Sequence, residues 1–287
     1  MSSLDHKIDF AVVLSVNCAN PNGDPLNGNR PRQNYDGYGE ISDVAIKRKI
    51  RNRLQDMGEA IFVQSNDRKT DEFDSLRERA DGQAELNQIL KSKNGSSDDF
   101  AQVACREWID VRSFGQVFAF KGSGNGGGVS VGVRGPVSIH TARSVDPIDI
   151  TSMQITKSVN SEPGKERGSD TMGMKHRVDF GVYVFYGSIN TQLAEKTGFT
   201  NDDADKIKQA LLTLFENDLS SARPEGSMEV HQVYWWEHNS KLGQYSSAKV
   251  HRSLTVKSKV EEPRSFEDYA IECCELDGLK AEVIDGR

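Results

Sequence analysis

The 287-residue chain is long enough to bury a hydrophobic core, and its 36% hydrophobic and 28% charged residues are typical of a globular protein with polar insertions. A formal net charge of −7 excludes loose attraction of nucleic acid to the whole surface, although a local basic groove remains compatible with it. No apolar run approaches ~20 residues, so we expect a cytoplasmic protein without a membrane span. The four cysteines lack metal-ligand spacing and indicate a reducing compartment, and no metal or cofactor is expected.

The first elements are a strand and a helix. Apolar residues alternate strictly over residues 8–18, which predicts a strand with one face less apolar than the other. The run Asn-Pro-Asn-Gly-Asp-Pro at 20–25 ends this strand, because its prolines lack backbone donors and Gly23 permits a positive φ. A helix then begins after Ser42, a plausible N-cap. Its apolar stripe comprises Ile46, Ile50, Leu54 and Met57.

This helix is crowded with cations. Five lie within seven residues, and they are Lys47, Arg48, Lys49, Arg51 and Arg53. In an acidic chain such a cluster favours a polyanion ligand, of which a nucleic-acid backbone is the commonest. A solvated helix face is the alternative interpretation.

The remaining elements follow in chain order. Residues 60–96 are polar and weakly helical and indicate an insertion rather than core, and Phe100, Val103, Ala104 and Trp108 form a second helical stripe. The glycine-rich loop at 122–128 lacks the helix and the Gly-Lys-Ser/Thr ending of a phosphate loop, so a flexible hairpin loop is the preferred interpretation. Strands are predicted over 111–120, 129–140, 176–186 and 229–237, a helix over 201–215, and irregular structure over 141–174.

When 60–110 and 141–174 are set aside as insertions, the order becomes strand, helix, two strands, helix, strand. This βαββαβ pattern predicts an α+β protein with a ferredoxin-like domain of the kind that RNA-recognition domains use. We expect one such domain over residues 1–260, followed by an acidic C-terminal segment at 261–287 with nine acidic and three basic residues. No aromatic RNP-type motif is present, so base stacking on the sheet is not expected.

Several motifs resemble one known family. Besides 20–25 they are Arg30-Pro31-Arg32, residues 42–52, 110–115, 135–139 and 142–148, Thr171–His176, and Ser220-Ser221-Ala222-Arg223-Pro224-Glu225-Gly226. In this order they resemble the backbone subunit of CRISPR surveillance complexes, the Cas-seven family of the RAMP superfamily, most closely in its type I-C (Csd-type) form.

The resemblance implies an RRM-like palm with inserted fingers at about 60–110 and a thumb at 141–174. Copies of such a subunit polymerise along a CRISPR guide RNA and present its spacer for pairing with target DNA, without being a nuclease. The implied partners are the guide RNA, the target DNA strand, further copies of the chain, and an end-cap subunit that processes the guide. The large and small subunits of the Cascade complex complete this set.

The residues expected to bind RNA are mostly cations, because phosphate contacts are independent of sequence and spacers differ. Lys47, Arg48 and Arg51 are the first choice for this role. Secondary candidates are Arg32, Arg112, Arg134, Arg143, Lys157, Lys175 and Arg177, with Asn20 and Asn22 as amide donors that turn formation would equally explain. In the thumb, Met153, Ile155 and Met172 are candidates for a wedge between bases, and core packing is the alternative for each.

A second hypothesis is a metal-dependent ribonuclease of the same superfamily. It would use Asp24, with Asp36 or Asp43 nearby, because divalent-metal hydrolysis needs clustered carboxylates. Turn chemistry alone also accounts for Asp24, between Gly23 and Pro25. His140, His176 and His231 show no nucleophile partner in the sequence. A third class, a structural oligomer without nucleic acid, leaves the basic helix unexplained.

Overall fold

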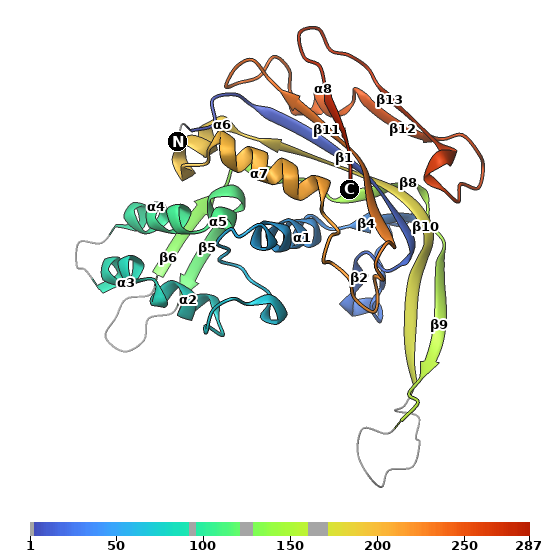
Figure 1. Cartoon of the computed structure of the whole chain (residues 1–287), viewed down its shortest axis with the longest axis horizontal. Helices are drawn as coiled ribbons and strands as arrows, with labels where there is room; N and C mark the ends of the chain where they lie inside the picture. The colour runs from blue at the N-terminus through green and yellow to red at the C-terminus, as the bar shows by residue number, and fades with distance from the viewer. Residues whose placement is uncertain (1–2, 92–95, 121–128, 160–171) are drawn as a thin grey trace.

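The computed structural model describes residues 3–91, 96–120, 129–159 and 172–287. Figure 1 shows a large sheet with helices, a helical region at one end, and a two-stranded ribbon that projects away from the sheet. The glycine-rich loop at 122–128 and most of the polar part of 141–174 lie outside the described residues. Within the described ranges, no helix has the length and apolar composition needed to cross a membrane.

The main sheet is antiparallel and has eight strands in the order β14-β11-β1-β10-β8-β4, with β7 and β9 also paired to β10. The α+β class is therefore confirmed, and the strands expected over 8–18, 176–186 and 229–237 are present. The sheet consists of β1 (Ile8–Ala19), β4 (Tyr38–Ile41), β7 (Val137–Ile139), β8 (Ala142–Pro147), β9 (Ile150–Thr156), β10 (Met172–Ile189), β11 (Met228–Glu237) and β14 (Glu282–Asp285).

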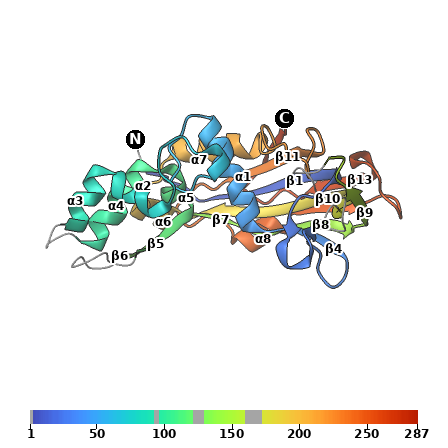
Figure 2. The same cartoon turned by 90° about the horizontal axis from the view of Figure 1, so that it is seen from below.

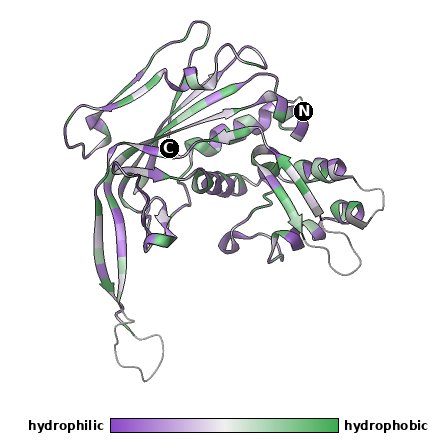
Figure 3. Ribbon diagram, turned by 180° about the vertical axis from the view of Figure 1, so that it is seen from behind, coloured by the Kyte–Doolittle hydropathy of each residue, from purple (hydrophilic) through white to green (hydrophobic). Residues whose placement is uncertain are grey.

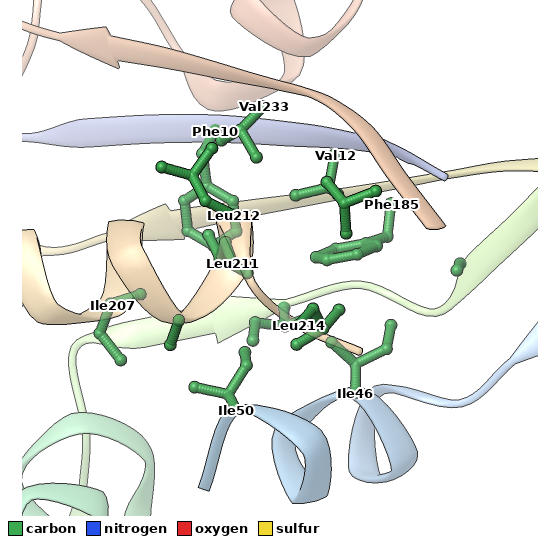
Figure 4. Close-up of a cluster of buried hydrophobic side chains, with 14 of the residues drawn as sticks. Phe10, Val12, Ile46, Ile50, Phe185, Ile207, Leu211, Leu212, Leu214 and Val233 are labelled. Atoms are coloured by element: carbon green, nitrogen blue, oxygen red, sulfur yellow. The ribbon is translucent and has the colours of Figure 1, made fainter. Parts of the chain in front are cut away.

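One face of the sheet is covered by helices α1 (Asp43–Asp56) and α7 (Asn201–Leu212), which is why alternate residues of β1 are apolar. Figure 4 shows side chains of both helices pointing toward Phe10 and Val12 of β1 and toward neighbouring strands. The expected N-cap is present, since the Ser42 hydroxyl accepts a hydrogen bond from the Ala45 N–H at 3.3 Å. The stripe of Ile46, Ile50 and Leu54 is buried, but Met57 is 38% exposed because the helix has already ended at Asp56.

The opposite face of the sheet is covered by the C-terminal part of the chain. Helix α8 (Ser247–His251) and the hairpin of β12 (Leu254–Ser258) and β13 (Tyr269–Cys273) form this layer. Tyr269 and Leu279 pack against residues of β1 and β11, and β14 extends the sheet beside β11. The acidic segment 261–287 is therefore folded onto the sheet rather than separate from it, because these apolar side chains anchor it.

The helical region has a core of its own. It comprises α2 (Leu76–Gly82), α3 (Ala84–Lys91), α4 (Ser97–Glu107), α5 (Ile109–Phe114), and the two-stranded sheet of β5 (Gly115–Phe120) and β6 (Val129–Arg134). The ring of Phe62 lies 4.7 Å from that of Trp108 and 5.0 Å from that of Phe118. The interpretation of 60–96 as lying outside any core is wrong, because Phe62, Ala80 and Leu86 are buried in this cluster. They pack with the predicted stripe of Phe100, Val103, Ala104 and Trp108.

Two expected strands are divided differently in the structure. Residues 109–114 form helix α5 instead of the start of a strand, since Ile109 packs into the sheet core while Val111 packs into the helical core. The strand expected over 129–140 is split into β6 and β7 at Gly135. A Cβ atom there would lie 2.3 Å from the Ser113 carbonyl oxygen, so only glycine fits.

The ribbon is formed by β9 and residues 172–178 of β10, and it projects beyond the sheet (Figure 1). Viewed from below, the helical region and the β9 side of the molecule lie at opposite ends of the long axis (Figure 2). The irregular structure expected over 141–174 is wrong for β8 and β9. Neither strand alternates apolar with polar residues strictly. Residues 151–156 of β9 have no buried face, and β8 buries only Ala142 and Ser144, of which Ser144 is polar.

Candidate nucleic-acid interface

The cations of α1 contact other groups of the same chain. Lys47 Nζ lies 3.0 Å from an Asp43 carboxylate oxygen, one helical turn earlier. The Arg48 guanidinium donates to the Val63 carbonyl at 2.6 Å, and Arg53 forms two further ion pairs. The helix face is therefore not a free cationic surface, and most of its charge is balanced within the chain.

Arg51 is part of the connection between the sheet and the helical region. Its Nε donates to Asp110 at 2.9 Å, and its guanidinium lies 5.1 Å from the centre of the Phe114 ring. Asp110 is fully buried and also accepts hydrogen bonds from the backbone N–H groups of Phe62 at 2.7 Å and Val63 at 3.1 Å. Because the buried carboxylate depends on these donors, Arg51 has a clear structural role.

Arg112 likewise connects the helical region to the helices that cover the sheet. Its guanidinium forms a two-pronged ion pair with Asp203, at 2.8 and 3.0 Å, and also donates to the Cys105 carbonyl at 3.3 Å. Asp203 completes the capping box of α7 with Thr200. Arg112 therefore fixes α5 to α7.

Lys49 links α1 to the loop that carries the 220–226 motif. Its ammonium is bonded to Asp218, which also accepts from Arg223 Nε at 3.1 Å. The Lys49 side chain is 6% exposed, and burial lowers the pKa of Lys49 to about 8. These contacts hold the 218–227 loop against α1.

The Asn-Pro-Asn-Gly-Asp-Pro run forms a tightly bonded turn. Asn20 Nδ2 donates to the Asn29 carbonyl at 2.7 Å, and the Asn22 side-chain oxygen accepts from the Ser42 N–H at 2.9 Å. The Asp24 carboxylate accepts from the Leu26 N–H at 3.2 Å, so it caps the short helix η1 (Pro25–Asn27). Local turn chemistry accounts for all three side chains.

Arg30, which is not among the predicted site residues, joins this segment to the ribbon. Its guanidinium donates to the Ser152 hydroxyl at 2.9 Å, and that hydroxyl lies 2.8 Å from His176 Nδ1. Ser152 and His176 are register partners on β9 and β10. Because Arg30 and Ser152 lie 122 residues apart, no sequence signal pointed to this contact.

The ribbon presents two different faces, since opposite residues of an antiparallel pair lie on the same face. Register pairs Lys175 with Met153 and Gly173 with Ile155, so these side chains share one face with Arg177. The other face carries Met172, Met174 and His176. The three wedge candidates are exposed, at 36% for Met153, 49% for Ile155 and 54% for Met172, but Met172 lies on the opposite face from the other two.

The exposed cations among the predicted site residues lie on the ribbon, on β8 and on β6 of the helical region. Lys157 and Lys175 are exposed, and no ion pair engages the Lys175 ammonium within the part of the chain that the structure describes. Arg177 lies 3.4 Å from Asp179, whereas Arg143 is exposed and stacks 4.6 Å from the Tyr38 ring centre. Arg134 is exposed at the end of β6, and Arg32 lies 3.5 Å from Asp24. Figure 3 shows hydrophilic and hydrophobic stretches along both ribbon strands.

The carboxylates of the ribonuclease hypothesis are not assembled into a metal site. Among the described residues no group of three or more His, Cys, Asp or Glu side chains could hold an ion. Asp24 caps η1 and Asp43 is paired with Lys47. Both carboxylates are therefore engaged in local contacts of the described chain.

Two of the histidines do have hydroxyl partners, which the sequence did not reveal. Besides the contact of His176 with Ser152, His231 Nε2 lies 2.9 Å from the Ser15 hydroxyl. The His231 ring stacks on Phe266 with centroids 3.6 Å apart, and burial lowers the pKa of His231. Ser15 is only 8% exposed, so this contact joins β1, β11 and the C-terminal layer.

The chain was compared with known proteins. The family model of CRISPR-associated protein Cas7 matches residues 6–274. A curated CRISPR-associated protein Cas7 from Haloferax volcanii is 24% identical over 229 residues, which cover 75% of this chain and 66% of that protein. The chain thus aligns with slightly less than two thirds of this relative's length.

A solved structure gives an independent likeness. One chain of a structure described as a CRISPR RNA-guided surveillance complex, pre-nicking, superposes with a TM-score of 0.50 at 15% identity. The match covers 80% of this chain and 78% of that chain. At this identity the likeness shows a shared fold.

Proposed function

This chain belongs to the CRISPR-associated protein Cas7 family, and we propose that it is the backbone subunit of a type I-C CRISPR surveillance complex, or Cascade. In this role, copies of the chain polymerise along a guide RNA and hold its spacer for pairing with target DNA in antiviral defence. The other partners are an end-cap subunit that processes the guide, a large subunit and small subunits. The proposed location is the cytoplasm.

The arrangement of the sheet supports an RRM-like palm. The strands β11, β1, β10 and β7 are adjacent in that order, and α1 and α7 pack on one face, as the βαββαβ order of a ferredoxin-like domain requires. We assign the helical region to the fingers and the ribbon to the thumb. The C-terminal layer covers the face on which an RRM stacks bases, so RNA contact must involve loops and the ribbon instead.

The observation that carries the proposal is the ribbon face with Met153, Ile155 and Lys175. Two exposed apolar side chains lie beside a cation that has no partner among the described residues. Gly173 opposite Ile155 adds no side chain, which leaves the flank of Ile155 open. An apolar wedge with an adjacent ammonium matches a strand of nucleic acid, in which bases stack and phosphates carry charge.

The phosphate contacts are assigned by exposure. We propose Lys175, Lys157, Arg143 and Arg134 as the principal contacts, because these side chains are exposed and lack a carboxylate partner within the described residues. The other candidates are each engaged inside the chain and would contribute only through their remaining donors. They are Asn20, Asn22, Arg32, Lys47, Arg48, Arg51, Arg112 and Arg177. Met172 remains a wedge candidate on the opposite ribbon face.

We further propose that the subunit is not catalytic. The contacts of Asp24 with the Leu26 N–H and with Arg32 are those of a structural turn residue. A metal-dependent ribonuclease using Asp24 is the alternative function, and no group of three or more possible metal ligands includes Asp24 among the described residues.

Purification of the chain from cells that express a CRISPR array tests the proposal. The expected result is a high ratio of absorbance at 260 nm to that at 280 nm, with extracted RNA that is intact and uniform in length. A protein free of nucleic acid under these conditions, which also fails to bind added guide RNA, would contradict the proposal. RNA shortened in a magnesium-dependent manner would support the ribonuclease instead.

A further inference from the structure

A small polar cavity of about 280 Å³ lies in the segment that joins β1 to α1. Asp24, Arg30, Arg32 and Glu40 line it, together with Asn27 and Asn34. Whole small molecules bind in cavities of roughly 300–1,000 Å³, so this volume suits one sugar–phosphate unit rather than a complete nucleotide.

Arg30 and Arg32 each have guanidinium donors that are not used within the described part of the chain. Arg32 Nε is buried without a hydrogen-bond acceptor among the described residues, and the nearest Arg32–Asp24 approach is 3.5 Å. Arg30 uses one nitrogen for Ser152, which leaves other donors of its guanidinium available. An unsatisfied guanidinium N–H beside a cavity favours an anionic acceptor, and a phosphate oxygen is such an acceptor.

Glu40 adds an acceptor to the same cavity. Its backbone is fixed, because its N–H donates to the Arg32 carbonyl at 2.9 Å and β4 pairs with β8. No hydrogen bond or ion pair engages its carboxylate in the described part of the chain. A carboxylate repels phosphate but accepts from a hydroxyl group, and the ribose 2′-hydroxyl is the donor that distinguishes RNA from DNA.

Tyr35 lies in the turn directly after the cavity-lining Asn34 and is fully exposed, with a relative exposure of 109%. The turn is rigid, since the Asn34 side chain accepts from the N–H groups of Asp36 at 3.0 Å and Tyr38 at 2.9 Å. The Gly37 carbonyl also accepts from the Ile148 N–H at 2.9 Å, which fixes the turn to the end of β8. An exposed aromatic ring on a fixed turn is a suitable platform for a base.

We propose that this cavity holds one ribose–phosphate of a bound RNA strand and makes the subunit selective for RNA over DNA. Arg30 and Arg32 contact the phosphate, Glu40 accepts from the 2′-hydroxyl, and Tyr35 stacks on the attached base. The inference rests on the proposed RNA-binding function and deepens it, because phosphate contacts by exposed cations alone would not distinguish the two nucleic acids.

The test compares single-stranded RNA with 2′-fluoro RNA of the same sequence, which keeps a ribose-like sugar conformation but cannot donate from the 2′ position. Wild type should bind the RNA roughly tenfold more tightly, as expected for one hydrogen bond to a charged group. Glu40→Ala should bind both probes equally. Glu272→Ala, an exposed glutamate on β13, is the matched control and should keep the wild-type ratio.

Tyr35 gives a second, independent measurement. Tyr35→Ala should weaken RNA binding at least about fivefold, whereas Tyr35→Phe should keep wild-type affinity because the ring remains. The exposed ring supports no core, so the melting temperature should not change in either variant. One outcome is that wild type binds RNA while Glu40→Ala keeps the wild-type ratio of affinities for RNA and 2′-fluoro RNA, and Tyr35→Ala keeps the wild-type affinity for RNA. In that case the cavity assignment is wrong while the proposed function stands. Failure of wild type to bind RNA would overturn both.

Discussion

Replacing Arg51 with alanine should lower the free energy of unfolding by about 2–3 kcal/mol. The Arg51 side chain is 12% exposed and its partner Asp110 is fully buried, so the variant loses a charge-assisted hydrogen bond in a poorly solvated site. It also loses the contact of the guanidinium with the Phe114 ring at 5.1 Å. Asp110 keeps two backbone donors, which holds the loss below that of an orphaned buried charge.

Urea unfolding followed by tryptophan fluorescence measures this loss, and RNA binding at several salt concentrations measures the number of phosphate contacts. Arg106→Ala is the matched control, because its ion pair with Glu85 is exposed and should contribute less than about 1 kcal/mol. Lys175→Ala should leave stability unchanged but reduce the salt slope of RNA binding by roughly 0.7. An Arg51→Ala protein with wild-type stability and a shallower salt slope would refute the structural role of Arg51 and identify it as a phosphate contact.

Three further predictions concern pH, catalysis and the ribbon. Because the folded-state pKa of Lys49 is about 8, below its ordinary value of 10.5, the unfolded chain holds a proton that the native protein releases between these values. The free energy of unfolding of the wild-type protein should therefore rise with pH between about 8 and 10.5. Lys49→Met should lack this rise in urea titrations, and a pH dependence identical to that of wild type would contradict the prediction. Asp24→Asn should leave guide RNA as intact as wild type does in magnesium or manganese, and cleavage by wild type alone would favour the ribonuclease. Ile155→Ala should weaken RNA binding more than Met172→Ala at equal melting temperature, and the reverse order would place RNA on the other ribbon face.

The central fold could be predicted from sequence because its signals are local. β1, β11 and the sheet portion of β10 each pack one face under α1 and α7 and the other under the C-terminal layer, and the more apolar face toward the helices recurs with period two. The apolar stripe of α1 and the N-caps of α1 and α7 likewise depend on residues that are close together in the sequence. The ribbon and the C-terminal layer gave weaker signals, because ribbon residues 151–156 bury neither face and a strand of five residues such as β13 is too short to show a clear period.

The candidate site could be predicted only in part, because charge is visible in a sequence while its partner is not. The Lys47–Asp43 pair lies within one helical turn and could have been recognised. Arg51 meets Asp110 at a separation of 59 residues, and Lys49 meets Asp218 at a separation of 169. The number of cations on α1 therefore gave too high an estimate of its free positive charge, because folding brings acidic residues from distant segments to the helix.

The same neutralisation restricts where the proposed nucleic-acid contacts can lie on this acidic protein. Outside the ribbon, the described part of the main sheet offers no open face, because α1 and α7 cover one side and the C-terminal layer covers the other. Charges on α1 are largely paired, so the unpaired cations among the described residues include Lys175 on the ribbon and Arg134 on β6. In the proposed function, a bound strand is therefore expected to be held at a few projecting points rather than on a continuous surface. Such discrete contacts suit a subunit that must hold any sequence while leaving bases accessible for pairing.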